Sequence, residues 1–255
     1  MSALILKLIA CLSMLTDHIG YFKPIDSYLI LRAIGRIAFP IFAWNIGNGY
    51  AHTKNKLRYF LTLLGAGVVS EIPFDLCFND KFFYFEDFNV MFTLALGLLS
   101  IMLIDAIPTV FKFLKPNIAK TLGLIVITAP IAFLADLICT DYAAYGVILI
   151  VLLWLAGNRK PWCAVRLLFF SLRSVIQYFL QDIFSGYAFS VAFDNIVAFS
   201  KRSVTPATVL SIPLILLYNG KSGYEKISAK AKGIIKYSFY AFYPVHLTVL
   251  YFIFR

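Results

Sequence analysis

Apolar runs of about 20 residues recur along this chain and constrain its fold more than any other feature. A helix needs about 20 apolar residues to cross the hydrocarbon core of a bilayer. Hydrophobic residues fill 61% of the 255 positions and charged residues only 14%, whereas soluble domains hold about 45–50% apolar residues. We predict an all-α fold, a polytopic transmembrane helical bundle that forms one domain over 1–255. About nine spans are expected, at 3–22, 29–50, 57–78, 89–107, 118–138, 142–157, 162–184, 203–219 and 234–254.

The loops between these runs predict the orientation of the chain. Clusters of Lys and Arg lie at 54–58, 112–120, 159–160 and 221–236, and the loops between them carry acids instead. Cytoplasmic loops collect Lys and Arg, so the N-terminus is expected in the cytoplasm. Residues 186–200 are then a re-entrant or surface segment. The first run shows no small-residue cleavage pattern, which favours a retained helix over a signal peptide.

The net charge of +10 does not indicate a nucleic-acid partner. Most of the basic loop residues flank apolar runs, where they set topology, and no aromatic–basic recognition module is present. The four cysteines, Cys11, Cys77, Cys139 and Cys163, stand singly. Without a Cys-x-x-Cys pair we expect neither a zinc site nor a disulfide framework, and no metal.

Ionisable residues inside the first run are the first candidates for a functional site. Lys7 and His18 share one helix stripe and lie about 16 Å apart along the axis. Asp17 precedes His18, and buried charges in a span are costly and frequently functional. The alternative is structural, with Lys7 snorkelling to the headgroups and His18 capping the outer end of the helix.

The second run carries two arginines one helical turn apart, Arg32 and Arg36. Guanidinium groups at membrane depth must meet carboxylates, carbonyls or an anionic ligand. Pro40 is expected to kink this helix. Beyond it, a second polar face leads to the cytosolic end through Asn45, Asn48 and His52. An anion-lined passage and a structural Arg–acid pair both fit this pattern.

Further polar groups are predicted at the same outer level on other spans. Glu71 and Asp75 lie on the third helix, and Glu71 is the simplest partner for Arg36. Asn89 begins the fourth span, where it fits a helix N-cap. On the last helix Tyr243 and His246 are i, i+3 neighbours beside a proline.

No soluble-enzyme motif is present: there is no Walker loop, G-x-G-x-x-G, G-x-S-x-G or His-Glu-x-x-His. A buried His/Arg/carboxylate site in a multi-pass membrane protein suits a transporter as well as an enzyme. The chain lacks a pseudo-repeat of broken helices, a common transporter device.

Several motifs together resemble the TraX family, in the expected order and over nearly the whole chain. They begin with Lys7 and Met14 and continue with Asp-His-Ile-Gly at 17–20, Gly-Arg-Ile-Ala-Phe-Pro-Ile-Phe-Ala at 35–43, Gly-Tyr-x-His-Thr at 49–53, Ser-Glu-Ile-Pro-Phe-Asp at 70–75, Asn-Val-Met-Phe-Thr at 89–93, Leu-Tyr-Asn-Gly at 217–220 and Phe-Tyr-Pro-Val-His at 242–246.

The resemblance implies a multi-pass acetyltransferase of the bacterial inner membrane with acetyl-CoA as donor. The family's namesake acetylates the amino terminus of conjugative pilin, so a pilin or another peptide is the expected acceptor. The family is also distantly similar to membrane acyltransferases that carry an Arg-x10-His motif. Lys7 and His18 have that spacing, with lysine in place of arginine. O-acetylation of a surface glycan or lipid, and a non-enzymatic transporter or assembly factor, remain alternatives.

These implications assign a role to each candidate residue. His18 is the expected general base, since its pKa range suits neutral pH, and Asp17 or Glu71 orients it. Arg36 or Tyr243 stabilises the oxyanion, and His246 is the rival base. The residues expected to meet acetyl-CoA are Lys7, Arg32, Asn45, Asn48 and His52.

Overall fold

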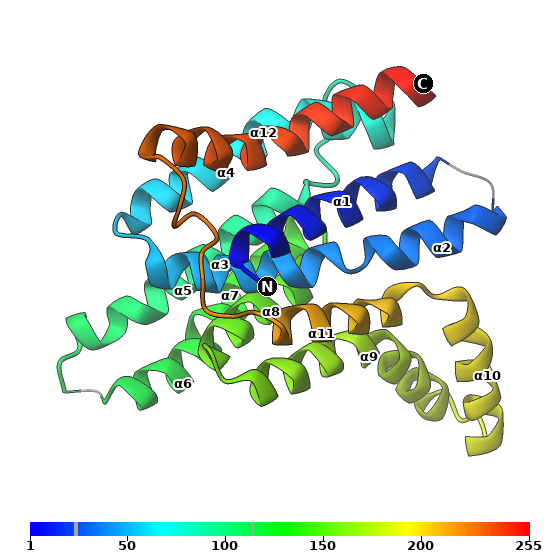
Figure 1. Cartoon of the computed structure of the whole chain (residues 1–255). Helices are drawn as coiled ribbons and strands as arrows, with labels where there is room; N and C mark the ends of the chain where they lie inside the picture. Colours follow the sequence, from blue (N-terminus) through cyan, green and yellow to red (C-terminus); the bar gives the residue numbers. More distant parts are fainter. Residues whose placement is uncertain (23–24, 114) are drawn as a thin grey trace. The chain divides into compact units, whose positions relative to one another are not determined.

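The computed structural model describes residues 1–22, 25–113 and 115–255 and is helical over nearly all of them (Figure 1). Across those three ranges it has no strand, only an isolated bridge between Phe88 and Thr140. The all-α prediction is confirmed. The elements are α1 (Ala3–Tyr21), α2 (Ile25–Gly35), α3 (Ala38–His52), α4 (Lys56–Asn79), α5 (Val90–Val110), α6 (Pro116–Val126), α7 (Thr128–Leu137), α8 (Ala143–Ala156), α9 (Lys160–Phe184), α10 (Phe189–Arg202), the 3-10 helix η1 (Thr205–Leu210), α11 (Ser211–Leu216) and α12 (Ala229–Phe254).

Seven helical segments of the described chain are long and apolar enough to cross a membrane. They are Ala3–Tyr21, Tyr28–His52, Lys56–Asn79, Val90–Val110, Lys120–Leu137, Lys160–Phe184 and Ala229–Phe254. Each corresponds to a predicted span, so the multi-pass prediction is confirmed. The other two predicted spans, 142–157 and 203–219, correspond to the shorter apolar helices Ala143–Ala156 and Thr205–Leu216. A count of nine and a cytoplasmic N-terminus stay predictions.

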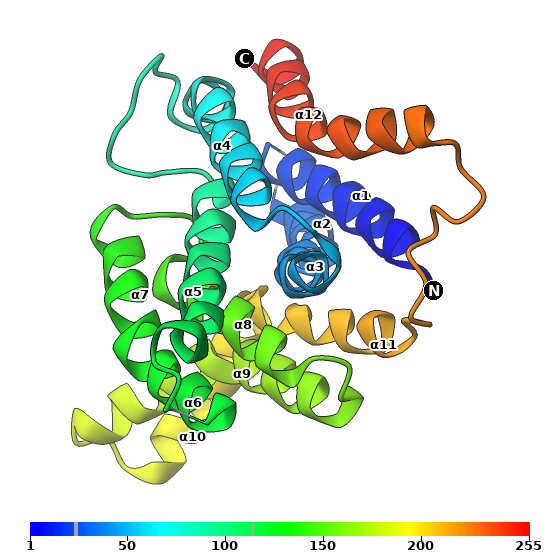
Figure 2. The same cartoon turned by 90° about the vertical axis from the view of Figure 1, so that its left-hand side faces the viewer.

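The chain forms two compact units, and each is described by itself. The first unit comprises Met1–Ile41 and Arg159–Lys221, and the second comprises Phe42–Asn158 and Ser222–Arg255. In the first unit α1 packs against α2, while α9 packs against α10, η1 and α11. In the second, α4 packs against α5 and α12, and α5 also packs against α7 and α8 (Figure 2).

The second predicted span is broken, as its proline suggested. Helix α2 ends at Gly35, and α3 begins at Ala38. Pro40 has no N–H to donate to the carbonyl of Arg36, four residues earlier, so the helix loses a backbone hydrogen bond at this turn, which favours a kink or a break there. The break separates the two polar faces predicted on this span.

Candidate functional site

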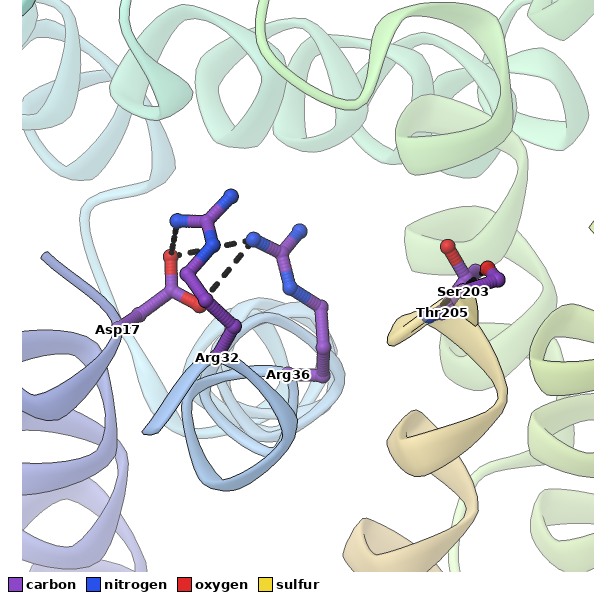
Figure 3. Close-up of polar contacts among 5 residues, drawn as sticks. All are labelled: Asp17, Arg32, Arg36, Ser203 and Thr205. Atoms are coloured by element: carbon purple, nitrogen blue, oxygen red, sulfur yellow. Dashed lines mark hydrogen bonds and ion pairs between the residues drawn. The ribbon is translucent and has the colours of Figure 1, made fainter. Parts of the chain in front are cut away.

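An ion-pair cluster joins α1 to α2 in the first unit (Figure 3). Arg36 Nη2 lies 3.1 Å from both Asp17 oxygens, and Arg32 Nη1 donates to Asp17 Oδ2. The three side chains are only 12–18% exposed. The sequence predicts Glu71 as the carboxylate that neutralises Arg36, but in the structure that carboxylate is Asp17. We call these three residues the Asp17 cluster.

Two glycines allow the helices to approach closely enough to form this cluster. A Cβ added to Gly35 would lie 2.2 Å from the Cβ of Asp17 and 2.3 Å from its Oδ1. A Cβ on Gly20 would lie 2.8 Å from the Cβ of Leu31. Contacts this short do not occur between packed atoms, so hydrogen at both positions is a steric requirement of the cluster.

Gly35→Ala is therefore expected to destabilise the protein by about 1–3 kcal/mol, the usual cost of overpacking, because Asp17 must move away from the arginines. The free energy of unfolding in mixed micelles measures the effect. Gly65→Ala on α4 is the matched control, because nothing lies within 4 Å of its added Cβ. Equal stability of the two variants would contradict the steric argument.

The position of Asp17 changes its expected role. Both of its oxygens accept hydrogen bonds from arginine, so it acts as the counter-ion of Arg32 and Arg36 rather than as a partner that orients His18. His18 follows it on α1 and is half-buried. Lys7, also half-buried, lies eleven residues earlier on the same helix, as predicted.

A second group of predicted residues comes together in the second unit around Asn89. Its side chain caps α5 by accepting from the N–H of Met91, at 3.0 Å, as the N-cap prediction required. The same amide donates to the carbonyl of Gly67 at 2.9 Å and to Glu71 Oε2. Glu71 Oε1 is buried and has no hydrogen bond within the described structure. Asn89 thus ties the start of α5 to α4.

Helix α12 contributes Tyr243 and His246 to this second group. Tyr243 is 1% exposed, and its hydroxyl lies against the backbone N–H of Val90 and within electrostatic range of Glu71. His246 Nδ1 lies 2.7 Å from the carbonyl oxygen of Phe242, and the ring stacks on Phe242. A carbonyl only accepts, so Nδ1 carries the proton, and Nε2 is the acceptor nitrogen of the neutral ring. In this tautomer Nε2 can accept a proton, as a general base must.

Asn89→Ala is expected to lower stability by about 1–3 kcal/mol, because it removes a helix cap and leaves the Gly67 carbonyl and Glu71 without their donor. Asn55→Ala removes a comparable but solvent-exposed cap, on α4, and should cost less. Unfolding of the two purified variants gives the comparison. A larger loss for Asn55→Ala would refute the bridging role of Asn89.

The residues predicted on α3 lie in the second unit, where they form no single cluster with one another. Asn45 is buried, Asn48 is half-buried, and His52 is exposed with Nδ1 2.8 Å from the carbonyl oxygen of Asn48. Sequence reasoning missed their neighbour Tyr50, whose hydroxyl donates to Asp105 Oδ2 at 2.7 Å. The sequence signal that could have identified this pair is Asp105, an aspartate within the long apolar run of α5.

Asp75, named with Glu71 from the sequence, has a local role in the second unit. It is 1% exposed, and its Oδ2 accepts from the backbone N–H of Tyr84 at 2.7 Å. This contact fastens the loop after α4 to the helix. In the part of the chain that the structure describes, no three His, Cys, Asp or Glu side chains gather as metal ligands would.

Comparison with known proteins places this arrangement in context. The family model described as TraX protein matches residues 2–254. A protein of Dichelobacter nodosus named "Probable fimbrial assembly protein FimC, serogroup H1" is 30% identical over 260 residues, which cover 98% of this chain and 94% of that protein. No solved structure matches.

Proposed function

The chain belongs to the TraX family, and on this premise we propose that it is an integral-membrane acetyltransferase of the bacterial inner membrane. It moves the acetyl group of cytosolic acetyl-CoA to the N-terminal amine of a pilin or another peptide. Two kinds of observation support the proposal. The family match runs from end to end of a multi-pass helical chain, and the relative's name refers to fimbrial assembly.

The observation that carries the proposal is the anchored position of His18. The preceding residue, Asp17, is held by two arginines, and Gly20 brings α1 against α2 two residues later. A half-buried histidine between two fixed points keeps a defined position, and a general base must be held in hydrogen-bonding reach of the proton it removes. Lys7 on the same helix is placed to attract the negatively charged donor.

The proposed reaction is an aminolysis of the thioester. The acceptor nitrogen attacks the acetyl carbonyl carbon, a C–N bond forms, and His18 takes the proton that leaves the amine. As the C–S bond breaks, protonated His18 gives that proton to the departing CoA thiolate, which leaves as the free thiol. A guanidinium of the Asp17 cluster stabilises the oxyanion between the two steps, because fixed positive charge lowers the energy of a developing negative charge. His246, with Tyr243 as the oxyanion donor, is the rival set in the second unit.

The relative's name also favours a second candidate, an assembly factor without catalysis. The test uses purified protein in lipid nanodiscs with isotope-labelled acetyl-CoA and a peptide whose N-terminal amine is free. Label in the peptide, and none in the same peptide blocked at its amine, supports N-acetylation. Label that reaches only a sugar or lipid hydroxyl supports O-acetylation. No consumption of acetyl-CoA with any acceptor would leave the assembly role as the better account.

A further inference from the structure

A buried carboxyl group on α4 has no role in the proposed reaction and no cationic partner. Glu71 Oε2 accepts from Asn89, whereas Oε1 is buried and makes no hydrogen bond within the residues that the structure describes. Asp75, one turn further along α4, is 1% exposed, and its Oδ1 is buried and also without a hydrogen bond there. In the described chain neither group forms an ion pair. Each of these neighbours thus keeps one acceptor oxygen available.

The electrostatic surroundings of Glu71 favour a cation. The charged groups with the largest effect on it are Asp75 and Asp87, and both are acids. Helix α4 ends at Asn79, so the negative end of its dipole lies about one turn beyond Asp75 and also attracts a cation. An ionised carboxylate inside a membrane-spanning segment is costly unless an opposite charge compensates it.

The basic side chains at this end of α4 are engaged elsewhere. Lys81 Nζ lies 4.2 Å from the ring centroid of Tyr84, and Arg255 Nη1, at the end of α12, lies 3.7 Å from Asp80 Oδ2. Because neither of them forms an ion pair with Glu71 among the described residues, the compensating charge has to come from a ligand.

The depth and shape of this position indicate the kind of cation. Glu71 lies eight residues before the end of α4, about 12 Å along the axis, which is deeper than the boundary where lipid headgroups lie. No third carboxylate, histidine or cysteine of the described chain completes a metal site with Glu71 and Asp75. A primary ammonium is slender and has three N–H donors for such acceptor oxygens.

The loop between α4 and α5 adds an apolar surface next to these carboxyl groups (Figure 2). Phe82, Phe83 and Phe85 are 60%, 60% and 74% exposed, and we call them the phenylalanine patch. The backbone N–H of Tyr84, between them, donates to Asp75 Oδ2 at 2.7 Å and fixes the loop to α4. A carboxylate without a cation beside an apolar patch suits a chain that begins with an ammonium and continues with apolar residues.

We propose that Glu71 binds the N-terminal ammonium of the acceptor peptide and that the phenylalanine patch contacts the apolar side chains behind it. This assignment rests on the proposed function for the acceptor being a peptide amine. One N–H of the ammonium donates to Glu71 Oε1, while Asn89 holds Oε2. The turn from Glu71 to Asp75 spans about 6 Å, which an extended peptide covers with about two residues. The side chains that follow these residues then meet the patch.

Peptide binding to the purified full chain in lipid nanodiscs, without acetyl-CoA, tests this site. The probe is a dye-labelled peptide whose free N-terminal residue is followed by leucines. The control ligands are the same peptide acetylated at its amine and a peptide with serines in place of the leucines. The wild type should bind the free amine about tenfold or more tightly than the acetylated peptide, as one charge-assisted hydrogen bond implies. Equal affinity for the two would overturn the site without any substitution.

Glu71→Gln should weaken binding of the free-amine peptide by about tenfold or more and leave binding of the acetylated peptide unchanged, because glutamine keeps the shape and loses the charge. Asp105→Asn is the matched control in the same unit, since its carboxylate accepts from Tyr50, and it should bind like the wild type. Unfolding curves verify that each variant is folded. Phe83→Ser should remove the preference for leucines over serines, and an unchanged preference would overturn the contact with the patch.

Further measurements separate this site from a lipid site and from the proposed reaction. Phosphatidylethanolamine also carries a primary ammonium, and native mass spectrometry measures its retention against phosphatidylglycerol. If Glu71→Gln lowers that retention while peptide binding is unchanged, the peptide site is overturned. Acetyl transfer by Glu71→Gln with a wild-type KM for the peptide would also overturn it and leave the acetyltransferase proposal standing. Peptide binding that depends on Glu71, without acetyl transfer to any acceptor, would do the reverse.

Discussion

His18→Ala should lower acetyl transfer by about 10²- to 10⁴-fold, the usual contribution of a general base. The amine would then have to lose its proton to water as it attacks the thioester. Because alanine favours a helix and His18 is only half-buried, the variant should insert and fold like the wild type. Single-turnover transfer from labelled acetyl-CoA to a peptide amine measures the effect.

The neighbouring variant Thr16→Ala is the matched control, since its hydroxyl donates to the carbonyl of Leu12, one turn back on the same helix. It should keep its activity. His246→Ala discriminates between the two candidate bases: if transfer is lost there and retained in His18→Ala, the base is His246. A wild-type rate in both histidine variants would exclude both His18 and His246 as the base.

Asp17→Ala is expected to destabilise the protein by about 3–5 kcal/mol, the cost of removing one partner of a buried ion pair. The variant leaves two guanidinium groups at membrane depth without the carboxylate that both contact. Unfolding of the purified variant in mixed micelles measures the loss. A second substitution, Arg36→Gln, should restore part of it, because it removes one of the uncompensated charges.

Asp182→Ala is the control variant, because it removes a partly buried carboxylate whose hydrogen-bond donor is the neutral side chain of Asn195. Asp182 Oδ2 accepts from Asn195 at 2.8 Å, a contact worth about 1 kcal/mol. If Asp17→Ala costs no more than Asp182→Ala, the cluster is not a stabilising ion pair. If Arg36→Gln adds its own full cost to that of Asp17→Ala, the two residues are not energetically coupled.

Local sequence patterns predicted much of the fold and many of the residues at its sites. Apolar runs of membrane-spanning length predicted the seven long helical segments, because a bilayer demands that length. Pro40 predicted a kink near the point where the structure has a break between α2 and α3, and Asn89 predicted a helix cap, because both effects depend on backbone groups only a few residues away. The same reasoning identified Asp17, Arg32 and Arg36 as charges in need of partners.

The pairing of those charges was decided by the tertiary structure. Glu71 was the predicted partner of Arg36, and Asp17 was predicted to orient His18, because charge alone does not distinguish two carboxylates predicted at one membrane level. The choice depends on how closely two helices approach, and Gly20 and Gly35 set that distance between α1 and α2. The sequence by itself determined that buried charge must be compensated. Packing between helices determined that Asp17 compensates it, because an ion pair requires contact within a few ångströms.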